Sequence, residues 1–237
     1  MTDQSQKIAT LLSTVTLGHG VGTKARPCTM AAINLAIDGR LTDKIPECVS
    51  PVIGRWVISI QDAMPLDRLN GARWRSLVPA IAGTGREHDG ERIAIIMDWM
   101  WGIALPQLQP VADACGFGAE WRTMCADRTA AAAFDAADAA ALEAAAEAAV
   151  LAPRVAARAA AAAEAASWVA FEASAEAAAE VAAEVAARVA AVVEAAVWAP
   201  RVAEAGMTAE YWTAIDPERL LEQLIMVGIA SPVRSAE

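Results

Sequence analysis

Arginine beside tryptophan is the arrangement in this sequence with the clearest binding chemistry. A guanidinium group forms forked hydrogen bonds with phosphate or carboxylate, and a tryptophan ring stacks on planar groups. The pattern predicts a site for a planar anionic ligand such as a nucleotide. The predicted ligand-binding residues are Arg55, Trp56, Arg73, Trp74, Arg75, Arg86 and Arg92.

A structural role is the alternative interpretation of the same residues, and the sequence favours it. Consecutive residues on a helix point in different directions, so an adjacent arginine and tryptophan do not share one face. On this interpretation the tryptophans fill the core, while the arginines face water or pair with carboxylates.

Acidic residues surround one histidine at positions 87–91. Glu87, His88 and Glu91 belong to the densest group with metal or acid-base potential, and His88 and Glu91 share a helix face at i and i+3. The spacing differs from that of a HExxH zinc motif, and the helix dipole alone favours acids in a first turn. The sequence therefore assigns no catalytic residue, metal site or cofactor, and an enzyme that uses these side chains is the third hypothesis.

The four cysteines, Cys28, Cys48, Cys115 and Cys125, show no CxxC spacing. The amino terminus, MTDQSQKIATLLSTV, contains an acid and lacks the features of a secretory signal, so we expect a cytoplasmic protein. In that compartment the cysteines are expected to be reduced thiols or core residues.

Charge excludes one class of function and disfavours another. The formal net charge is -10 at pH 7 and the pI is about 4.8, whereas a general nucleic-acid binder needs a basic face that displaces counterions from phosphates. Glu or Arg recurs every few residues through most of the alanine-rich stretch, so no membrane span is expected.

Residues 1–118 have a mixed composition and predict a helical bundle. Apolar residues recur at helical spacing between Ser, Gly and Pro signals, of which Ser50-Pro51 is the strongest start and Gly39 the clearest stop. The predicted helices run from Ser5 to Val15, from Pro27 or Cys28 to Ile37, from Val52 to Met64, from Arg73 to Ile81 and, as the most hydrophobic and central one, from Ile93 to Leu105. Pro106 is expected to kink this central helix or to restart it.

Glycines at positions 18, 20 and 22 precede Lys24 and suggest a phosphate-binding loop. A P-loop needs glycine directly before the lysine, and Thr23 stands there instead. No strand pattern comes before the segment, so it is predicted to be a plain flexible connector.

Residues 119–206 are alanine-rich and predict long helices, elongated or folded as a hairpin, because alanine has the highest helix propensity. The first of these helices is predicted to run without a break from Ala119 through the alanine tract to Leu151. VLAPRVA recurs as VWAPRVA, which places Pro153 and Pro200 at the same point of two related segments. Proline costs about 3 kcal/mol inside a helix and little at its first position, so each Ala-Pro predicts a corner. The sequence predicts helix in residues 153–198 and leaves open whether it is one helix or two.

An apolar stripe at four-residue intervals runs through this tract beside a stripe of Glu and Arg. A stripe of this kind needs a cover, so its valines are the predicted contact surface for a protein partner or a second copy of the chain. These valines are Val181, Val185, Val189 and Val193. Residues 207–237 contain a closing amphipathic helix that is expected to dock on the amino half.

Three blocks of the sequence carry a resemblance. They are CTMAAINLAIDGRLTDKIPECVSPVIGRWVISIQDAMP, then AGTGREHDGERIAIIMDWMWGIALPQLQP before the alanine tract, and LLEQLIMVG near the end. In this order they resemble a group of uncharacterised alanine-rich proteins from bacterial and bacteriophage genomes. The resemblance implies an accessory role in a prokaryote or phage and carries over no catalytic residue.

These features together predict an all-α protein with a bundle in residues 1–118, long alanine-rich helices in 119–206 and a closing helix in 207–237. The leading hypothesis is a non-enzymatic protein that binds a protein partner or itself. The alternative is a protein that binds or sequesters a small nucleotide-type ligand, as in phage counter-defence.

Overall fold

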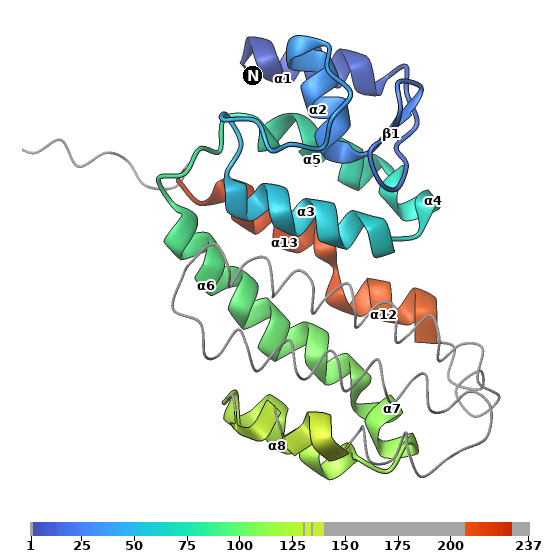
Figure 1. Ribbon diagram of the computed structural model, residues 1–237, viewed down its shortest axis with the longest axis vertical. Coiled ribbons are helices and arrows are strands. Elements are labelled where there is room, and N and C mark those ends of the chain that lie inside the picture. Colours follow the sequence, from blue (N-terminus) through green and yellow to red (C-terminus); the bar gives the residue numbers. More distant parts are fainter. Residues whose placement is uncertain (1, 130, 134, 140–206, 229–237) are drawn as a thin grey trace, which may run out of the picture. The chain divides into compact units, whose positions relative to one another are not determined.

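The computed structural model describes residues 2–129, 131–133, 135–139 and 207–228. These residues are mainly helical, and their strands form one short hairpin (Figure 1). The prediction of a helical fold is therefore confirmed. The predicted corners at Pro153 and Pro200, and the question of one helix or two in residues 153–198, fall outside the described residues.

Packing divides the chain into two compact units. The first contains Met1–Ile95 together with Pro217–Glu237, and the second contains Ile96–Asp216. The boundary lies inside a helix and not at residue 118, where the composition changes. The two divisions differ because alanine content is a property of the chain, whereas a compact unit is defined by contacts between distant segments.

The first unit begins with α1, Asp3–Leu12, which Thr2 caps by accepting a hydrogen bond from the Ser5 amide. Strands β1, Gly22–Thr23, and β2, Arg26–Pro27, then pair antiparallel, with Gly22 opposite Pro27. The prediction of a plain connector here is wrong. Gly22 has φ +72°, and a Cβ atom there would lie 2.1 Å from the Arg26 carbonyl oxygen, so glycine is what permits the hairpin.

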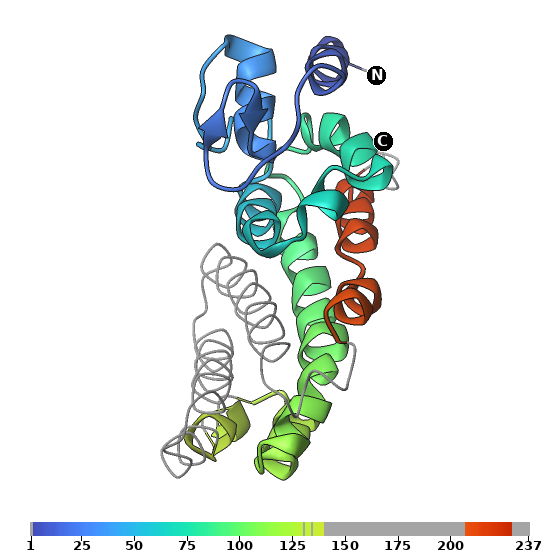
Figure 2. The same cartoon turned by 90° about the vertical axis from the view of Figure 1, so that its right-hand side faces the viewer.

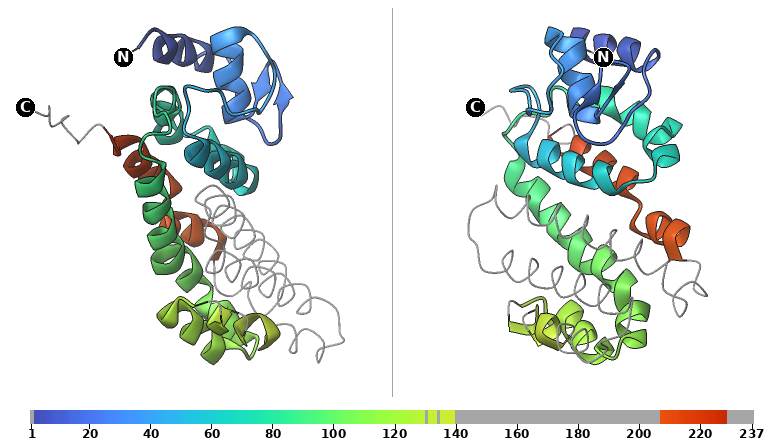
Figure 3. Two further views of the ribbon diagram at one scale, coloured as in Figure 1. Left: turned by 60° about the vertical axis from the view of Figure 1, so that its left-hand side comes forward. Right: turned by 45° about the vertical axis from the view of Figure 1, so that its right-hand side comes forward.

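Two predicted helix boundaries are confirmed in the first unit. Helix α2, Thr29–Asp38, packs beside the hairpin (Figure 3) and ends at Gly39, which adopts the left-handed conformation with φ 76°. Helix α3, Pro51–Ala63, starts after Ser50, whose hydroxyl accepts a hydrogen bond from the Ile53 amide at 3.3 Å.

Short helix α4, Leu66–Leu69, precedes α5, Ala72–Ile81, and α13, Pro217–Met226, completes the unit from the far end of the sequence. Helix α13 packs against α3 and α5 (Figure 2). Arg68 on α4 pairs with both carboxylate oxygens of Glu218, which is 4% exposed. The largest buried apolar side chains of this unit are Trp56, Trp74, Ile8, Leu17, Met30, Ile33, Ile53, Ile60 and Met64.

Helix α6, Asp89–Trp99, continues as a π-helical turn at Met100–Ala104, a 3-10 turn at Leu105–Leu108 and α7, Gln109–Ala114. Pro106 has no N–H to give to the carbonyl of Gly102, so regular α-helical hydrogen bonding stops at this point. The predicted kink at Pro106 is therefore confirmed, and it takes the form of a wider turn followed by a tighter one.

Helix α8, Gly118–Asp127, ends at Arg128, which has φ 53°. The prediction of an unbroken helix from Ala119 into the alanine tract is wrong at this residue. The Thr129 hydroxyl accepts a hydrogen bond from the Ala132 amide at 3.3 Å, so a new helix begins there with its own cap.

Helix α12, Met207–Ile215, belongs to the second unit and is fixed to α6 by a hydrogen bond of 2.7 Å from Trp99 Nε1 to the Ile215 carbonyl. Among the described helices, none is long and apolar enough to cross a membrane.

Candidate functional site

The first unit contains an open pocket of about 930 Å³ between α1, α5, the loop before α6 and the end of α13. This volume lies in the range of small-ligand sites. Five side chains that line it carry hydroxyl groups, and four are ionisable. The hydroxyl residues are Thr2, Ser5, Ser13, Ser76 and Thr84, and the ionisable residues are Arg75, Glu87, His88 and Arg92.

Helices α1 and α5 form two sides of the pocket and run in opposite directions (Figure 1). Arg75, in the first turn of α5, fixes their alignment because its Nη2 donates to the carbonyls of Leu12 and Val15 at the end of α1. Arg75 therefore marks one end of the pocket. Thr2, at the start of α1, and Glu87, beyond the end of α5, mark the other end.

Three of the hydroxyl groups already donate their proton to a backbone carbonyl. Ser13 donates to Thr10 at 2.7 Å, Ser76 donates to Arg73 at 2.7 Å, and Thr84 donates to Ile81 at 2.8 Å. A hydroxyl oxygen in this state still has lone pairs with which to accept. Ser13 and Ser76 therefore present acceptors to the pocket, whereas the Thr84 oxygen already accepts a hydrogen bond from the Ser50 amide.

Pro79 adds another acceptor to the wall of the pocket. It lies inside α5 and lines the pocket, and because it has no N–H the carbonyl of Arg75 lacks its α-helical donor. This carbonyl lies one turn before Pro79 on the same side of the helix. It gives the pocket a backbone acceptor near the end where Arg75 lies.

The guanidinium group of Arg75 keeps part of its donor capacity. Its Nη1 donates to Asn70 Oδ1 at 3.3 Å, and its Nη2 donates to the two carbonyls of α1 and its following turn. Arginine has five N–H donors, so Nε–H and one hydrogen on Nη1 have no acceptor in the described part of the chain. Arg75 is half-buried, and these donors provide the group in the pocket best suited to an anion.

Arg92 also lines the pocket, but its donors are all in use. Its Nε donates to Leu224 at 3.1 Å, Nη1 to Gly85 at 2.7 Å and to the Asp89 carboxylate at 3.1 Å, and Nη2 to Thr84 and Val227. Arg92 is 1% exposed. It bonds to carbonyls at the end of α13 and in the loop before α6, so its role is to hold these two segments together.

The same carboxylate extends this junction to α3. Asp89 Oδ1 accepts a hydrogen bond of 2.5 Å from Ser50, the residue that caps α3. The Ser50 amide in turn donates to the Thr84 hydroxyl at 2.9 Å. Arg92, Asp89 and Ser50 thus hold the starts of α3 and α6 and the end of α13 in one hydrogen-bonded group, called the Arg92 junction below.

His88 lies between this junction and the pocket. Its Nδ1 is 3.4 Å from Glu91 Oε1, so the i and i+3 pair expected from the sequence is present. Gly228 packs against its ring: a Cβ atom there would lie 2.6 Å from His88 Cδ2, and Gly228 has φ +95°. Glycine is therefore required where α13 ends beside the imidazole.

The two predicted stacking tryptophans lie in the core. Trp56 and Trp74 are both fully buried, and their rings pack on each other with centroids 6.3 Å apart. Trp74 Nε1 donates to the Thr29 hydroxyl at 3.3 Å. Their faces are thus covered by protein, and neither belongs to the pocket lining.

The remaining predicted arginines lie apart from the pocket. Arg73 is exposed on α5 and pairs with Glu222 of α13 through contacts of 3.1 and 3.2 Å. Arg55 is half-buried on α3, and Arg86 is exposed in the loop before α6. Of the predicted ligand-binding residues, the structure brings only Arg75 and Arg92 into the pocket lining.

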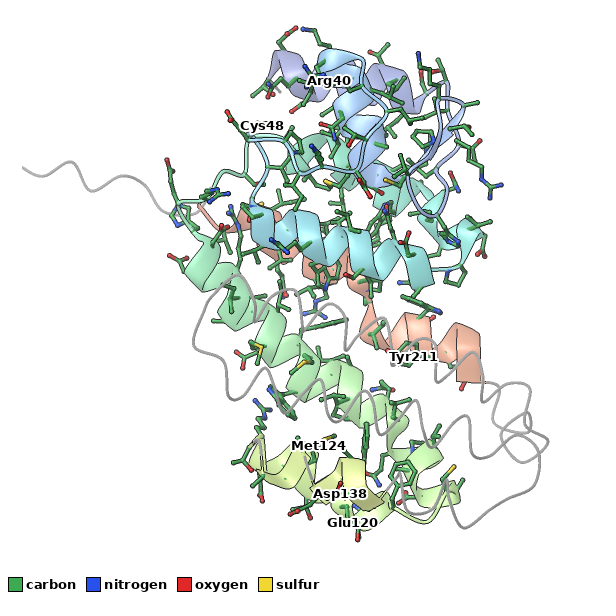
Figure 4. The ribbon with its side chains drawn as sticks, in the orientation of Figure 1. Arg40, Cys48, Glu120, Met124, Asp138 and Tyr211 are labelled. Atoms are coloured by element: carbon green, nitrogen blue, oxygen red, sulfur yellow. The ribbon has the colours of Figure 1, made fainter. Side chains whose placement is uncertain are left out.

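Burial affects the protonation of two cysteines and one tyrosine. All four cysteines are free thiols, and burial raises the pKa of Cys28 and raises the pKa of Cys125 to about 11, so both thiols are protonated at neutral pH. Cys48 lies on the loop that leads into α3, and Tyr211 lies on α12 (Figure 4). Burial raises the pKa of Tyr211 as well.

Within the described ranges, no group of three or more His, Cys, Asp or Glu side chains is placed to hold a metal ion. The valine stripe at Val181, Val185, Val189 and Val193 lies outside those ranges. The sequence did not single out the pocket's hydroxyl residues. The available signal was the row Thr2, Ser5, Ala9, Leu12 and Ser13, in which small and hydroxyl residues recur at helical spacing.

No family model, curated protein or solved structure matches this chain.

Proposed function

We propose that this protein is a non-catalytic binder of a small ligand with an acidic group, and that Arg75 receives this group. The observation that carries the proposal is the pocket of about 930 Å³ in the first unit, with two unused Arg75 donors at one end. An acidic group bonded to arginine gains charge-assisted hydrogen bonds, which are roughly twice as strong as neutral ones.

The chemistry of the lining supports binding and not catalysis. Arg92 is saturated with acceptors, and the hydroxyl groups of Ser13, Ser76 and Thr84 donate to backbone carbonyls, so none of these three hydroxyls has a base that takes its proton. A nucleophilic hydroxyl needs such a base within hydrogen-bond reach. The buried Trp56 and Trp74 are not available for stacking, and this moves the proposal away from a purine or pyrimidine ligand.

A thermal-shift screen tests this function. The panel contains nucleotides, cyclic nucleotides, small carboxylic acids, amino acids and short peptides. A ligand present at about 100 times its Kd stabilises the folded state by about 2.7 kcal/mol. We expect at least one class with an acidic group to raise the Tm.

Two tryptophan substitutions on α5 locate the binding. Ala80 is exposed and lines the pocket, so Ala80→Trp fills it and is expected to abolish the shift. Ala72 is exposed on the same helix but does not line the pocket, so Ala72→Trp is the matched control. The proposal fails if no compound shifts the Tm, or if a folded Ala80→Trp variant binds as tightly as the wild type.

We also propose self-association as a second function, which rests on the sequence alone. The four valines recur at four-residue intervals, a spacing that predicts an apolar helix stripe beside Glu184 and Arg188. Light scattering of the full chain tests it: Val185→Glu together with Val189→Glu is expected to turn an oligomer into a monomer, and Glu184→Gln is expected to leave the oligomer intact. A wild-type chain that stays monomeric at every concentration rules this function out.

A further inference from the structure

The pocket between α1 and α5 has different chemical groups at its two ends. Arg75 lies near the start of α5, and Gly83 lies eight residues further along. The α-helical part of this stretch, from Arg75 to Ile81, spans about 9 Å at about 1.5 Å per residue, and Ala82 and Gly83 continue beyond the end of the helix. A ligand that contacts both ends must therefore be extended, and an extended peptide covers that distance with about three to four residues.

The charges at the two ends differ in sign. At one end Arg75 retains two donors, while at the other end Glu87 presents an exposed carboxylate beside His88. Arg92 is also at this second end, but Asp89 and four backbone carbonyls surround its guanidinium group. The pocket thus complements a ligand with a carboxylate at one end and an ammonium group at the other.

The wall between the two ends accepts more hydrogen bonds than it donates. The Ser13 and Ser76 hydroxyl protons are given to backbone carbonyls, and Pro79 leaves the Arg75 carbonyl without its helical donor. A ligand for this wall must bring N–H groups along its length. A peptide backbone does so, whereas a phosphate-rich ligand brings acceptors.

Aliphatic groups fill the rest of the lining. Ala9, Leu12, Ile225 and Val227 contribute apolar surface. Small aliphatic side chains of a bound peptide would cover this surface, and the hydrophobic effect favours its burial.

We infer that the pocket binds a short peptide of about three to four residues with both termini free. The carboxylate lies at Arg75, and the ammonium group lies at Glu87. This inference rests on the proposed ligand-binding function and names its ligand class. Recognition of both termini separates a free peptide from a segment within a folded protein.

The test uses the tripeptide Ala-Val-Ala, its carboxamide and its N-acetyl form with the full-length protein in calorimetric titrations. The free tripeptide is expected to bind, the carboxamide at least tenfold more weakly, and the acetylated form several-fold more weakly. Wild-type protein suffices for this comparison, so no variant has to fold. Equal affinities for the acid and the carboxamide would overturn the inference.

Matched variants assign each terminus to its residue. Arg75→Gln is expected to remove the difference in affinity between the acid and the carboxamide. Arg73→Gln changes an arginine on another side of α5, outside the pocket lining, and is expected to preserve that difference. Glu87→Gln is expected to remove the difference between the free and the acetylated amino terminus. A folded Arg75→Gln variant that still discriminates acid from carboxamide contradicts the assignment.

The thermal-shift panel distinguishes failure of the peptide inference from failure of the ligand-binding function. If no tripeptide binds but another acidic compound does, and Ala80→Trp blocks that compound, the peptide inference is wrong and the ligand-binding function stands. If nothing in the panel binds, both are wrong.

Discussion

Two arginines of the first unit differ in how many of their hydrogen-bond donors are bonded within the protein. Arg92 is 1% exposed and gives every donor to described residues, whereas Arg75 is half-buried and keeps two donors. Both line the same pocket. An arginine whose donors are all bonded to protein acceptors stabilises the fold. An arginine in the same pocket that keeps donors can bind a ligand.

The Arg92 junction is expected to produce the largest effect on stability. Arg92→Met removes the guanidinium donors from four carbonyls and leaves the Asp89 carboxylate with Ser50 as its donor, and breaking a buried pair costs about 3 to 5 kcal/mol. Urea unfolding measures the loss. A change below about 1 kcal/mol would show that water replaces the guanidinium group and that the junction is not structural.

Arg75→Gln is expected to have a smaller effect on stability and a larger effect on ligand binding. It removes hydrogen bonds to Leu12, Val15 and Asn70 at a half-buried position, with an expected loss of about 1 to 2 kcal/mol. The affinity for an acidic ligand should fall at least tenfold. A stability loss as large as that of Arg92→Met would show that Arg75 also has a structural role and would contradict the difference proposed between the two arginines.

Ser50→Ala sharpens the definition of the Arg92 junction. It removes the cap of α3 and a donor to Asp89, with an expected loss of about 1 kcal/mol. Because Ser50 and Arg92 share Asp89, their substitutions should not be additive in a double-mutant cycle. Strict additivity would mean that the cap and the junction act separately.

Arg73→Gln is expected to have the smallest effect. Its pair with Glu222 is nearly half exposed on both sides, and exposed pairs contribute about 0.2 to 1 kcal/mol. The loss should shrink further in 1 M salt, because salt screens exposed charges. Glu218→Gln is the buried counterpart, and its loss should exceed that of Arg73→Gln in the same titration since Glu218 is 4% exposed.

The sequence alone was sufficient where the signal was local. Ser50-Pro51 and Gly39 act through backbone groups within a few residues, so the start of α3 and the end of α2 follow from residue type. The break at Arg128 also has a local signal, the Thr129 cap, but the high helix propensity of the following alanines predicts a helix that continues through this point.

Only the tertiary structure shows which arginines have all their donors bonded within the protein and which keep donors for a ligand. Their acceptors lie far away in the sequence: Arg92 reaches Leu224 and Val227, and Arg75 reaches Leu12 and Val15. Spacing along the chain does not encode such contacts, because they depend on where α13 and α1 pack. The sequence by itself determined a helical protein with particular helix boundaries, and packing decided which charges remain for a ligand.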